Sequence, residues 1–488
     1  MGYLSLLLAL PLAGAALIAL LPSERILLIR RAAIAAAGAA LTLAWALAFG
    51  FDTSAAGMQY AESIKWNPRL GTTYALGVDG VSLPLVMLAT LLALVAILAS
   101  KSIQNRAKGY YLLMLVLEAA MLGVFMAQDW ALFYVFWELT LIPLFFLIDR
   151  WGGKNRSAAS LNFVLYTMGG SVFMLIALLL LFDAVPGHSF AMADMARGAP
   201  ALPAETQVLI FLGLLIGFGV KMPIFPIHGW LPLAHVEAPS PVSILLSGIL
   251  LKMGSYGLLR AVVLLPDAAQ TLQGVLLGIA LVSLVYGGLL AWRQTDLKAM
   301  IAYSSISHMG VVLVGIAALN VAGLTGAVMQ MVAHGLVAGA LFLLIGLLYE
   351  RTHTREISHY SSLIRVTPRF AFFTILAFVA AVGMPGTAGF IAELHALIGG
   401  FARWGWLMVL LSVGVLISAA YAIRTVGRLF TGPVRPQMRE VTDLRGSEMW
   451  AASVLTAGIL LLGIFPEPAL RLSQATLASL SASLGAGL

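Results

Sequence analysis

Several ionisable residues of this sequence stand inside long apolar stretches, where charges are rare. A charged side chain near the middle of a lipid bilayer costs roughly 2.5–3.5 kcal/mol on insertion scales, so each such residue is a functional hypothesis by default. Carboxylic acids, amines and imidazoles all transfer protons, and these groups form a line along the chain rather than a cluster suited to one ligand. The pattern predicts a proton relay built from Glu138, Lys221, Lys252, His308, His334 and Glu393.

The first two relay residues, Glu138 and Lys221, suggest a switch. A carboxylate close to a buried lysine favours the protonated amine, and separating the two favours release of the proton. A Glu138/Lys221 pair would therefore hold the proton when close and release it when apart. Lys252, the histidines and Glu393, bridged by water, would then carry the proton onward without a cofactor.

Helix-breaking residues stand beside two of these groups. Proline removes a backbone donor and clashes with the carbonyl four residues earlier, so the helix is expected to break next to Lys221. Broken helices inside membranes line cavities and mark ion sites in transporters. The two sets of breakers are Pro223 and Pro226 after Lys221, and Gly383, Pro385 and Gly386 before Glu393.

The elements that carry these groups are predicted to be membrane-spanning helices. The chain has 488 residues, of which 61% are hydrophobic and only 10% charged, which excludes a soluble enzyme. Each span needs about 20 apolar residues, and the sequence predicts an all-α polytopic membrane protein with about fourteen of them. The predicted spans are 3–21, 27–50, 82–100, 109–127, 130–149, 157–182, 206–235, 239–265, 271–292, 297–317, 321–349, 366–400, 404–428 and 447–466.

The two broken spans, the seventh and the twelfth, are five spans apart and so run in opposite directions. That arrangement is typical of an inverted repeat. We expect three N-terminal spans with an outer loop, two inverted five-helix repeats, and a last span with a tail. These parts cover residues 1–108, 109–265, 266–430 and 431–488, and loop 51–81 is long enough for a small hairpin.

The net charge of +7 does not indicate nucleic acid. Most of the 28 lysines and arginines fall in alternate loops, and such loops face the cytoplasm by the positive-inside rule. An even number of spans then places both termini in the periplasm.

Three further residues are candidates for the points where protons enter: Glu118, His228 and His235. No third ligand accompanies the two histidines, so no metal is expected there. The sequence has no cysteine, which excludes a cysteine-held iron–sulfur cluster. Redox chemistry would need a partner subunit.

Several segments resemble the antiporter-like membrane subunits of respiratory complex I, over about residues 80–430. The resemblance is carried by FWE in the fifth span, KMPIFPIHGWLPLAHVEAPSPVSILLSGILLKMGSYGLLR, YSSISHMG and HGLVAGALFLLIGLLYERTHTREI. It implies a fourteen-helix core with two inverted repeats and a hydrated axis of the six relay residues. Glutamate at position 393, where related types carry lysine, is similar to the M type, the subunit-4 type of mitochondria.

The resemblance also implies a function. It is that of a non-redox subunit of a proton-pumping NADH:quinone oxidoreductase, moving protons from cytoplasm to periplasm. NADH, FMN, iron–sulfur clusters and quinone would be bound by partner subunits, with L- and N-type chains as neighbours. Because no organelle-type transit segment precedes the first span, a bacterial inner membrane is expected.

Other functions stay open at this point. A multi-subunit cation/proton antiporter and a membrane-bound hydrogenase share this module, although Glu393 disfavours the antiporter. A membrane scaffold that pumps nothing would tolerate Lys221→Met with full activity. A single-chain transporter of an organic substrate is weakened because the polar residues form a line.

Overall fold

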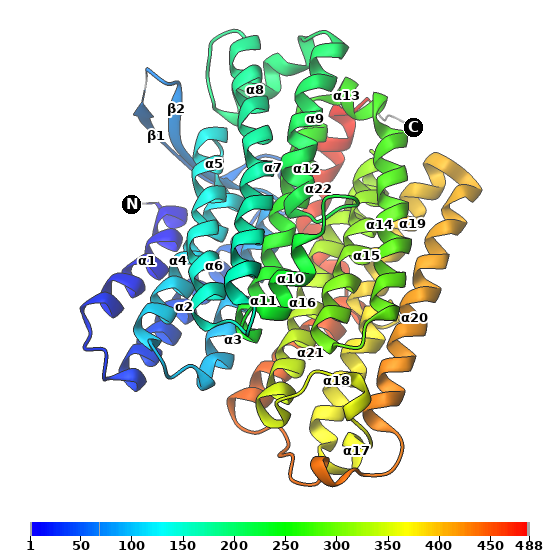
Figure 1. Ribbon diagram of the computed structural model, residues 1–488. Helices are drawn as coiled ribbons and strands as arrows, with labels where there is room; N and C mark the ends of the chain where they lie inside the picture. Colours follow the sequence, from blue (N-terminus) through cyan, green and yellow to red (C-terminus); the bar gives the residue numbers. More distant parts are fainter. Residues whose placement is uncertain (1, 68, 486–488) are drawn as a thin grey trace.

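The structure is a computed structural model that describes residues 2–67 and 69–485, and it is a bundle of helices that run side by side (Figure 1). Thirteen helices of the described residues are long and apolar enough to cross a membrane. One of these, Ala388–Phe430, has 43 residues and contains a 3-10 turn at Gly405–Met408. The sequence predicted two spans here. The chain is a multi-pass membrane protein, and the count of fourteen stays a prediction.

The N-terminal part consists of four long helices and one hairpin. Strands β1 and β2 pair antiparallel, with Ser63 opposite Ala75, which confirms the hairpin predicted in loop 51–81. Helix α1 packs against α2 and α4, and α2 packs against α3. The elements are α1 Tyr3–Leu20, α2 Ile26–Phe49, β1 Gln59–Asn67, β2 Thr72–Val78, α3 Ser82–Ala99 and α4 Ala107–Met126.

The middle of the chain is made of interrupted helices. The predicted seventh span is two helices, α9 and α10, and the predicted fifth span is also divided, into α5 and α6. A π-turn at Leu246–Leu250 joins α11 to α12. The elements are α5 Trp130–Leu139, α6 Leu141–Trp151, α7 Arg156–Ala184, α8 Met192–Gly198, α9 Ala204–Lys221, α10 Trp230–Glu237, α11 Ser240–Leu245, α12 Leu251–Leu264 and α13 Pro266–Thr271.

The C-terminal part contains the longest single helix, α16, and the second broken span, α18 and α19. Helix α16 packs against α15 and α19, and α14 packs against α15 and α20. The elements are α14 Gln273–Arg293, α15 Leu297–Ala317, α16 Val321–Thr352, α17 Leu363–Val366, α18 Pro368–Ala381, α19 Ala388–Trp404, α20 Val409–Phe430, α21 Ser447–Ile464 and α22 Glu467–Ser483.

Three segments form the centre of the bundle: α11–α12, α15 and α16. Nearly all of their residues are buried, whereas α2, α7 and α21 leave most of theirs uncovered. A helix that is apolar all round belongs in the interior of a large protein or in a membrane. The central helices carry Lys252, His308 and His334, so the fold places these groups in its most enclosed part.

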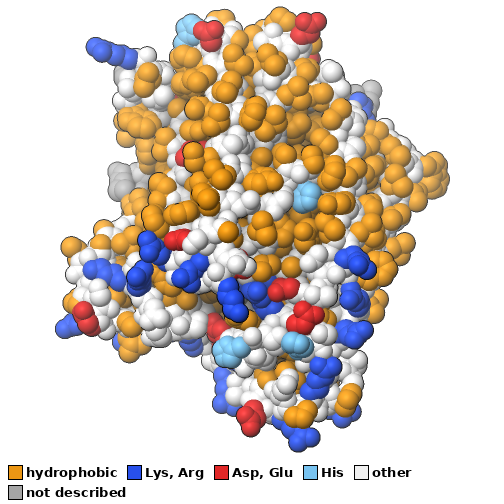
Figure 2. Space-filling model, viewed as in Figure 1, with side chains coloured by type: hydrophobic (Ala, Val, Ile, Leu, Met, Phe, Trp, Pro, Cys, Tyr) orange, Lys and Arg blue, Asp and Glu red, His pale blue; other side chains and the backbone are white. Residues whose placement is uncertain are grey.

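Charge is unevenly distributed over the surface. Figure 2 shows a broad apolar band over the upper part of the molecule, with lysines and arginines gathered below it. The hairpin, α8 and α13 lie at the upper end in the same view, and α17 lies at the lower end (Figure 1). The basic loops therefore face away from the hairpin, as the charge pattern predicted, while the assignment of either end to cytoplasm or periplasm stays a prediction.

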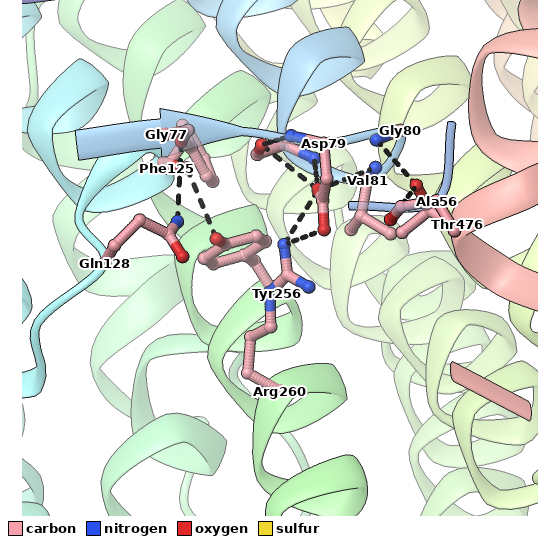
Figure 3. Close-up of polar contacts among 11 residues, drawn as sticks. Ala56, Gly77, Asp79, Gly80, Val81, Phe125, Gln128, Tyr256, Arg260 and Thr476 are labelled. Carbon is pink, nitrogen blue, oxygen red and sulfur yellow. Dashed lines mark hydrogen bonds and ion pairs between the residues drawn. The ribbon is translucent and has the colours of Figure 1, made fainter. Parts of the chain in front are cut away.

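A buried ion pair connects the loop after β2 with central helix α12 (Figure 3). Arg260 Nη2 lies 2.8 Å from Oδ1 and 2.7 Å from Oδ2 of Asp79. Asp79 Oδ1 also accepts hydrogen bonds of 3.0 Å from the backbone N–H groups of Val81 and Ser82, where α3 begins. One carboxylate thus fixes the start of α3 and its position against α12.

Helices α16 and α19 approach each other most closely at Gly326. A Cβ at this position would lie 2.3 Å from the backbone nitrogen of Ala396 in α19. No side chain occupies the contact, so no rotamer change relieves the clash. The absence of a Cβ at Gly326 therefore sets the distance between two helices that both carry predicted relay residues.

Replacing Gly326 with alanine is expected to destabilise the protein. Forcing extra volume into a packed contact costs about 1–3 kcal/mol, and the apparent melting temperature of the purified protein in detergent would fall. Gly278→Ala is the matched control, because a Cβ on this exposed glycine of α14 meets nothing within 4 Å. Equal melting temperatures for both variants would contradict the tight α16–α19 contact.

Candidate functional site

The break in the seventh span lies directly after Lys221, which is the last residue of α9. Residues 222–229 are not helical, and they include Pro223 and Pro226, so the predicted break is present. A break inside a membrane must still pair its backbone polar groups. The indole Nε1 of Trp230 donates to the carbonyl of Val220 at 2.8 Å, which satisfies one carbonyl that the broken helix leaves free.

Lys221 is buried and points toward the interruption of the fifth span. Its Nζ donates to the Thr140 hydroxyl at 2.9 Å and to the Trp137 carbonyl at 3.2 Å. The same nitrogen lies 4.0 Å from the centre of the Trp137 ring, within the range of a cation–π contact. Thr140 separates α5 from α6, and Pro143 supplies no N–H in the first turn of α6. The interruption therefore supplies the acceptors for a buried ammonium group.

Glu138 does not form an ion pair with Lys221 in this conformation. No ion pair within 4.0 Å joins the two among the described residues, and one carboxylate oxygen of Glu138, Oε1, has no hydrogen-bond partner there. Successive residues of a helix point about 100° apart, and it is the neighbouring Trp137 that faces Lys221. Glu138 instead lines a half-open groove with Tyr134 and Met168 on the side of α5–α7. The close pairing that the sequence suggested is absent here.

Lys252 is the centre of the second group of polar residues. Its Nζ lies 2.6 Å from Nδ1 of His334 and donates to the carbonyl of Ser247 at 2.5 Å. Ser247 lies in the π-turn that joins α11 to α12, and its hydroxyl lies 3.1 Å from the hydroxyl of Ser305 in α15. Such π-turns occur frequently at functional sites. Through Lys252 and Ser247 this turn connects α12 with both α16 and α15.

The line continues from His334 to His308 and Glu393. The two imidazole rings lie 5.3 Å apart, centre to centre. His308 Nδ1 lies 3.4 Å from the amide nitrogen of Gln330 and 3.9 Å from Oε1 of Glu393. All four side chains line one cavity of about 10 Å³, which is at the lower limit of the space that a water molecule needs.

The break before Glu393 is also present, between the end of α18 and the start of α19. Gly383 and Gly386 have φ angles of +75° and +91°, in the region that favours glycine, and Pro385 lies between them. A Cβ on Gly383 would lie 2.3 Å from Oε2 of Glu393. Glycine at position 383 thus allows the turn of the backbone and leaves space for the carboxylate.

The structure divides the six predicted relay residues into two parts. Glu138 and Lys221 lie at the α5–α6 interruption, and Lys252, His334, His308 and Glu393 follow one another across α12, α16, α15 and α19. No hydrogen bond among the described residues joins Lys221 to Lys252. Helices α9 and α12 do pack together, but Lys221 is directed toward α5 and Lys252 toward α16.

Comparison with known proteins identifies the family. A sequence model described as NADH:quinone oxidoreductase/Mrp antiporter, transmembrane, matches residues 127–418, more than half of the chain. The chain belongs to this family. It is 40% identical to NAD(P)H-quinone oxidoreductase chain 4 2 of Thermosynechococcus vestitus, over 96% of this chain and 89% of that protein. It is 42% identical to NADH-quinone oxidoreductase subunit M of Rhodobacter capsulatus, over 86% and 83%.

A solved structure supports the same assignment. A chain of respiratory complex I from Thermus thermophilus with bound NADH superposes with a TM-score of 0.91 at 33% identity, covering 99% of this chain and all of that chain. The resemblance to the antiporter-like subunits of complex I, and to the M type in particular, is thereby confirmed. The mostly helical membrane fold is confirmed with it.

Glu118, His228 and His235 were predicted as points where protons enter. All three side chains are buried, and each has polar atoms without a hydrogen-bond partner among the described residues. Both carboxylate oxygens of Glu118 and both ring nitrogens of His235 have no hydrogen-bond partner among the described residues, nor has Nδ1 of His228. His235 stacks on Phe342, with ring centres 4.5 Å apart. Buried polar groups without a protein partner are commonly satisfied by water. In the part of the chain that the structure describes, no hydrogen bond joins any of the three to the relay residues.

Sequence reasoning missed several polar residues that the structure adds to the site. Thr140, Ser247 and Gln330 contact relay residues through the bonds described above. Gln330 could have been predicted as a site residue, because it lies four residues before His334 and therefore on the same face of a helix. Lys298, at the start of α15, is also buried, and it donates to the Ala238 carbonyl at 2.7 Å.

Among residues 2–67 and 69–485, no group of three or more histidine, aspartate or glutamate side chains is arranged to hold a metal ion.

Lys252→Met is expected to leave folding stability nearly unchanged. The variant loses the bonds to His334 and Ser247, at about 1–3 kcal/mol, but it also removes the desolvation penalty of a buried charge, which is several kcal/mol. Arg260→Met should behave differently, because it leaves Asp79 as an unpaired buried charge, at about 3–5 kcal/mol. Melting curves of the purified protein would compare the two. A drop for Lys252→Met as large as for Arg260→Met would contradict this.

Proposed function

We propose that this chain is a proton-translocating membrane subunit of NADH:quinone oxidoreductase, without a redox centre of its own. Its relatives carry the names of subunits of that enzyme. The observation that carries the proposal is the succession of proton-exchanging groups from Lys252 through His334 and His308 to Glu393. Lys252 and His334 are 2.6 Å apart, the two imidazole rings 5.3 Å between centres, and His308 and Glu393 3.9 Å. Three of these groups lie in the most enclosed helices, and they are hard to explain as stabilising elements, since burial of charge is costly.

Proton transfer would begin at the contact between Lys252 and His334. With Lys252 protonated and Nδ1 of His334 unprotonated, the ammonium group would donate to Nδ1, and one proton could pass across this contact of 2.6 Å. Two protonated groups at this distance would repel each other strongly, so the pair holds one excess proton. His308 and then Glu393 receive that proton, with the small cavity between them able to hold one bridging water.

Lys221 would gate the supply of protons to this line. In the conformation described, Thr140 and Trp137 hold its ammonium group away from Glu138. Glu138 stands on the same turn of α5, next to Trp137 but facing the groove, where a change in its charge or position alters the preference of Lys221 for its proton. We therefore propose that Glu138 receives the coupling signal from outside the chain.

The remaining assignments follow the family resemblance and the charge distribution. Protons would move from the end with the basic loops, taken as cytoplasmic, to the hairpin end, taken as periplasmic, so that both termini face the periplasm of a bacterial inner membrane. NADH, FMN, iron–sulfur clusters and quinone would be bound by partner subunits. L- and N-type antiporter-like chains would be neighbours, and one of them would cover the groove at Glu138.

A second function is kept because the family description includes Mrp antiporters. The same line of groups in a cation/proton antiporter, or in a hydrogenase, would move protons with different partners. Purification of the tagged chain from its native membrane distinguishes them. Partners with flavin, iron–sulfur clusters and NADH:quinone activity support the first proposal, whereas antiporter subunits alone or a nickel–iron hydrogenase would overturn it.

Lys221→Met is expected to leave assembly intact and to lower proton pumping about 100-fold or more, the lower end of the range for a positioned proton-transfer group. NADH-driven acidification of inside-out vesicles measures the effect. Lys65→Met is the control, because this lysine is exposed on the hairpin. An assembled Lys221→Met complex with normal pumping would make the chain a scaffold and refute the proposal.

Glu138→Gln is expected to leave assembly intact and to lower turnover about tenfold, because the loss of one nearby charge removes the influence of this residue on Lys221. The coupled rate of NADH oxidation measures this. Glu205→Gln, at an exposed position in the first turn of α9, is the control. Unchanged turnover in Glu138→Gln would remove this residue from the mechanism.

A further inference from the structure

A pocket of about 220 Å³ opens beside Arg260, between the hairpin, α8 and α22. Its walls include Met58, Met192 and Leu480 from these outer elements, together with Gln128 and Trp130. Trp130 is buried, yet its indole Nε1 has no hydrogen-bond partner among the described residues, and neither has the guanidinium Nε of Arg260. Buried donors of this kind bind water, and the pocket has room for several molecules.

The pocket is aligned with the relay through helix α12. Lys252, Tyr256 and Arg260 are spaced four residues apart and so lie on one face of the helix, with steps of about 6 Å. Lys252 holds the inner position, at the contact with His334, and Arg260 holds the outer position, at the pocket. This face is therefore the shortest connection between the relay and the hairpin end of the protein.

Tyr256 closes this connection in the conformation described. It is fully buried, and its hydroxyl donates to the carbonyl of Phe125 at 3.3 Å. The two rings meet edge to face at 5.4 Å, and the guanidinium carbon of Arg260 lies 4.9 Å from the centre of the Tyr256 ring. Figure 3 shows Tyr256 and Arg260 side by side beneath the loop that contains Asp79. No hydrogen bond among the described residues leads from the pocket past this ring to Lys252.

We propose that the pocket is a water-filled vestibule on the hairpin side and that Arg260, held by Asp79, is the charge barrier that stops protons from flowing back to Lys252. This inference rests on the proposed function, because a barrier is needed only where a proton path exists. Arginine cannot relay a proton, since its guanidinium stays protonated in proteins. A fixed positive charge next to a water-filled path does, however, repel protons, as in other membrane pores.

The ion pair accounts for the position of the barrier. Both carboxylate oxygens of Asp79 bind the same nitrogen of Arg260, Nη2. The other guanidinium nitrogens are left for the side of the pocket, and Nε is one of its unpartnered donors. Asp79 is itself fixed by the backbone of Val81 and Ser82. Arg260 therefore cannot swing away without losing its ion pair with a carboxylate that is itself fixed.

The first test measures passive proton leak at rest. Vesicles with the whole complex, in right-side-out orientation and without NADH, receive an acid pulse, and a trapped dye reports the internal pH. The double variant Asp79→Asn/Arg260→Gln keeps shape and hydrogen-bonding groups but removes both charges. It is expected to raise the leak about tenfold, because Arg260 lines the pocket and Asp79 does not, so near the water the loss of the positive charge outweighs the loss of the negative one. Arg260→Lys, which keeps the charge, should stay near the wild-type leak.

A matched ion pair elsewhere provides the control. Arg351 and Glu448 are 2.6 Å apart and mostly buried, but they join α16 to α21 away from the pocket. The double variant Arg351→Gln/Glu448→Gln should leave the leak unchanged. An equal rise in this control, or no rise in Asp79→Asn/Arg260→Gln, would overturn the proposal. Because no turnover is involved, this result is separate from the pumping result of Lys221→Met.

A second test does not depend on assembly of the double variant. The chain has no cysteine, so Val263→Cys places a single thiol in the wall of the pocket, half-buried beside Arg260. A membrane-impermeant thiosulfonate reagent applied from the hairpin side should label it. A sulfonate-bearing label should then raise the leak, and a trimethylammonium label should not. If the thiol is not labelled, the proposal of a water-filled vestibule is overturned. If both labels give the same leak, the proposal of a charge barrier is overturned.

Discussion

A cation buried in an apolar bundle must find hydrogen-bond acceptors inside the protein, and regular helices do not offer them. Backbone carbonyls of an intact helix are already paired within the helix. This protein meets the constraint by interrupting helices where its lysines point. Trp137 and Thr140 stand where α5 gives way to α6, and Ser247 stands in the π-turn before α12. The helices are thus interrupted at the places where the buried lysines need hydrogen-bond acceptors.

The interruptions also explain the order of packing. Helices α11–α12, α15 and α16 are enclosed because they carry groups that lipid would not tolerate, and the divided helices α9–α10 and α18–α19 are among those that pack against them. Where the surrounding helices break, the freed backbone groups are bound by side chains such as Trp230 on Val220. Close approach at Gly326 and Gly383 then brings α19 and its carboxylate against the centre.

The sequence allowed the prediction of features that depend on residue type alone. Proline and glycine clusters predict breaks because their backbone preferences are intrinsic, and both breaks lie where Pro223, Pro226, Gly383, Pro385 and Gly386 stand. The hairpin and the buried ionisable groups were predictable for the same reason. The division of the fifth span at Thr140 had a weaker signal, because Pro143 is close to a helix start, where proline is tolerated.

Features that depend on packing between distant helices were not predictable from one sequence. Glu138 and Lys221 are opposite charges on neighbouring spans, yet which residue of α5 faces the lysine is set by the rotation of the helix. The bond between Lys252 and His334 spans 82 residues and requires the π-turn to direct Lys252 toward α16. The burial of Lys298 follows from the path of the loop before α15, which its charge does not reveal.

Helix α16 is continuous over 32 residues, although its neighbours α11–α12 and α18–α19 are interrupted. At 1.5 Å per residue it is about 48 Å long, well beyond the roughly 30 Å of a hydrocarbon core. An unbroken helix is stiff, whereas a break is compliant. Helix α16 is thus a rigid element that crosses the bundle, and it fixes the positions of His334 and Gln330 relative to each other. The lengths of the contacts to His334 therefore depend mainly on the interrupted helices that pack against α16.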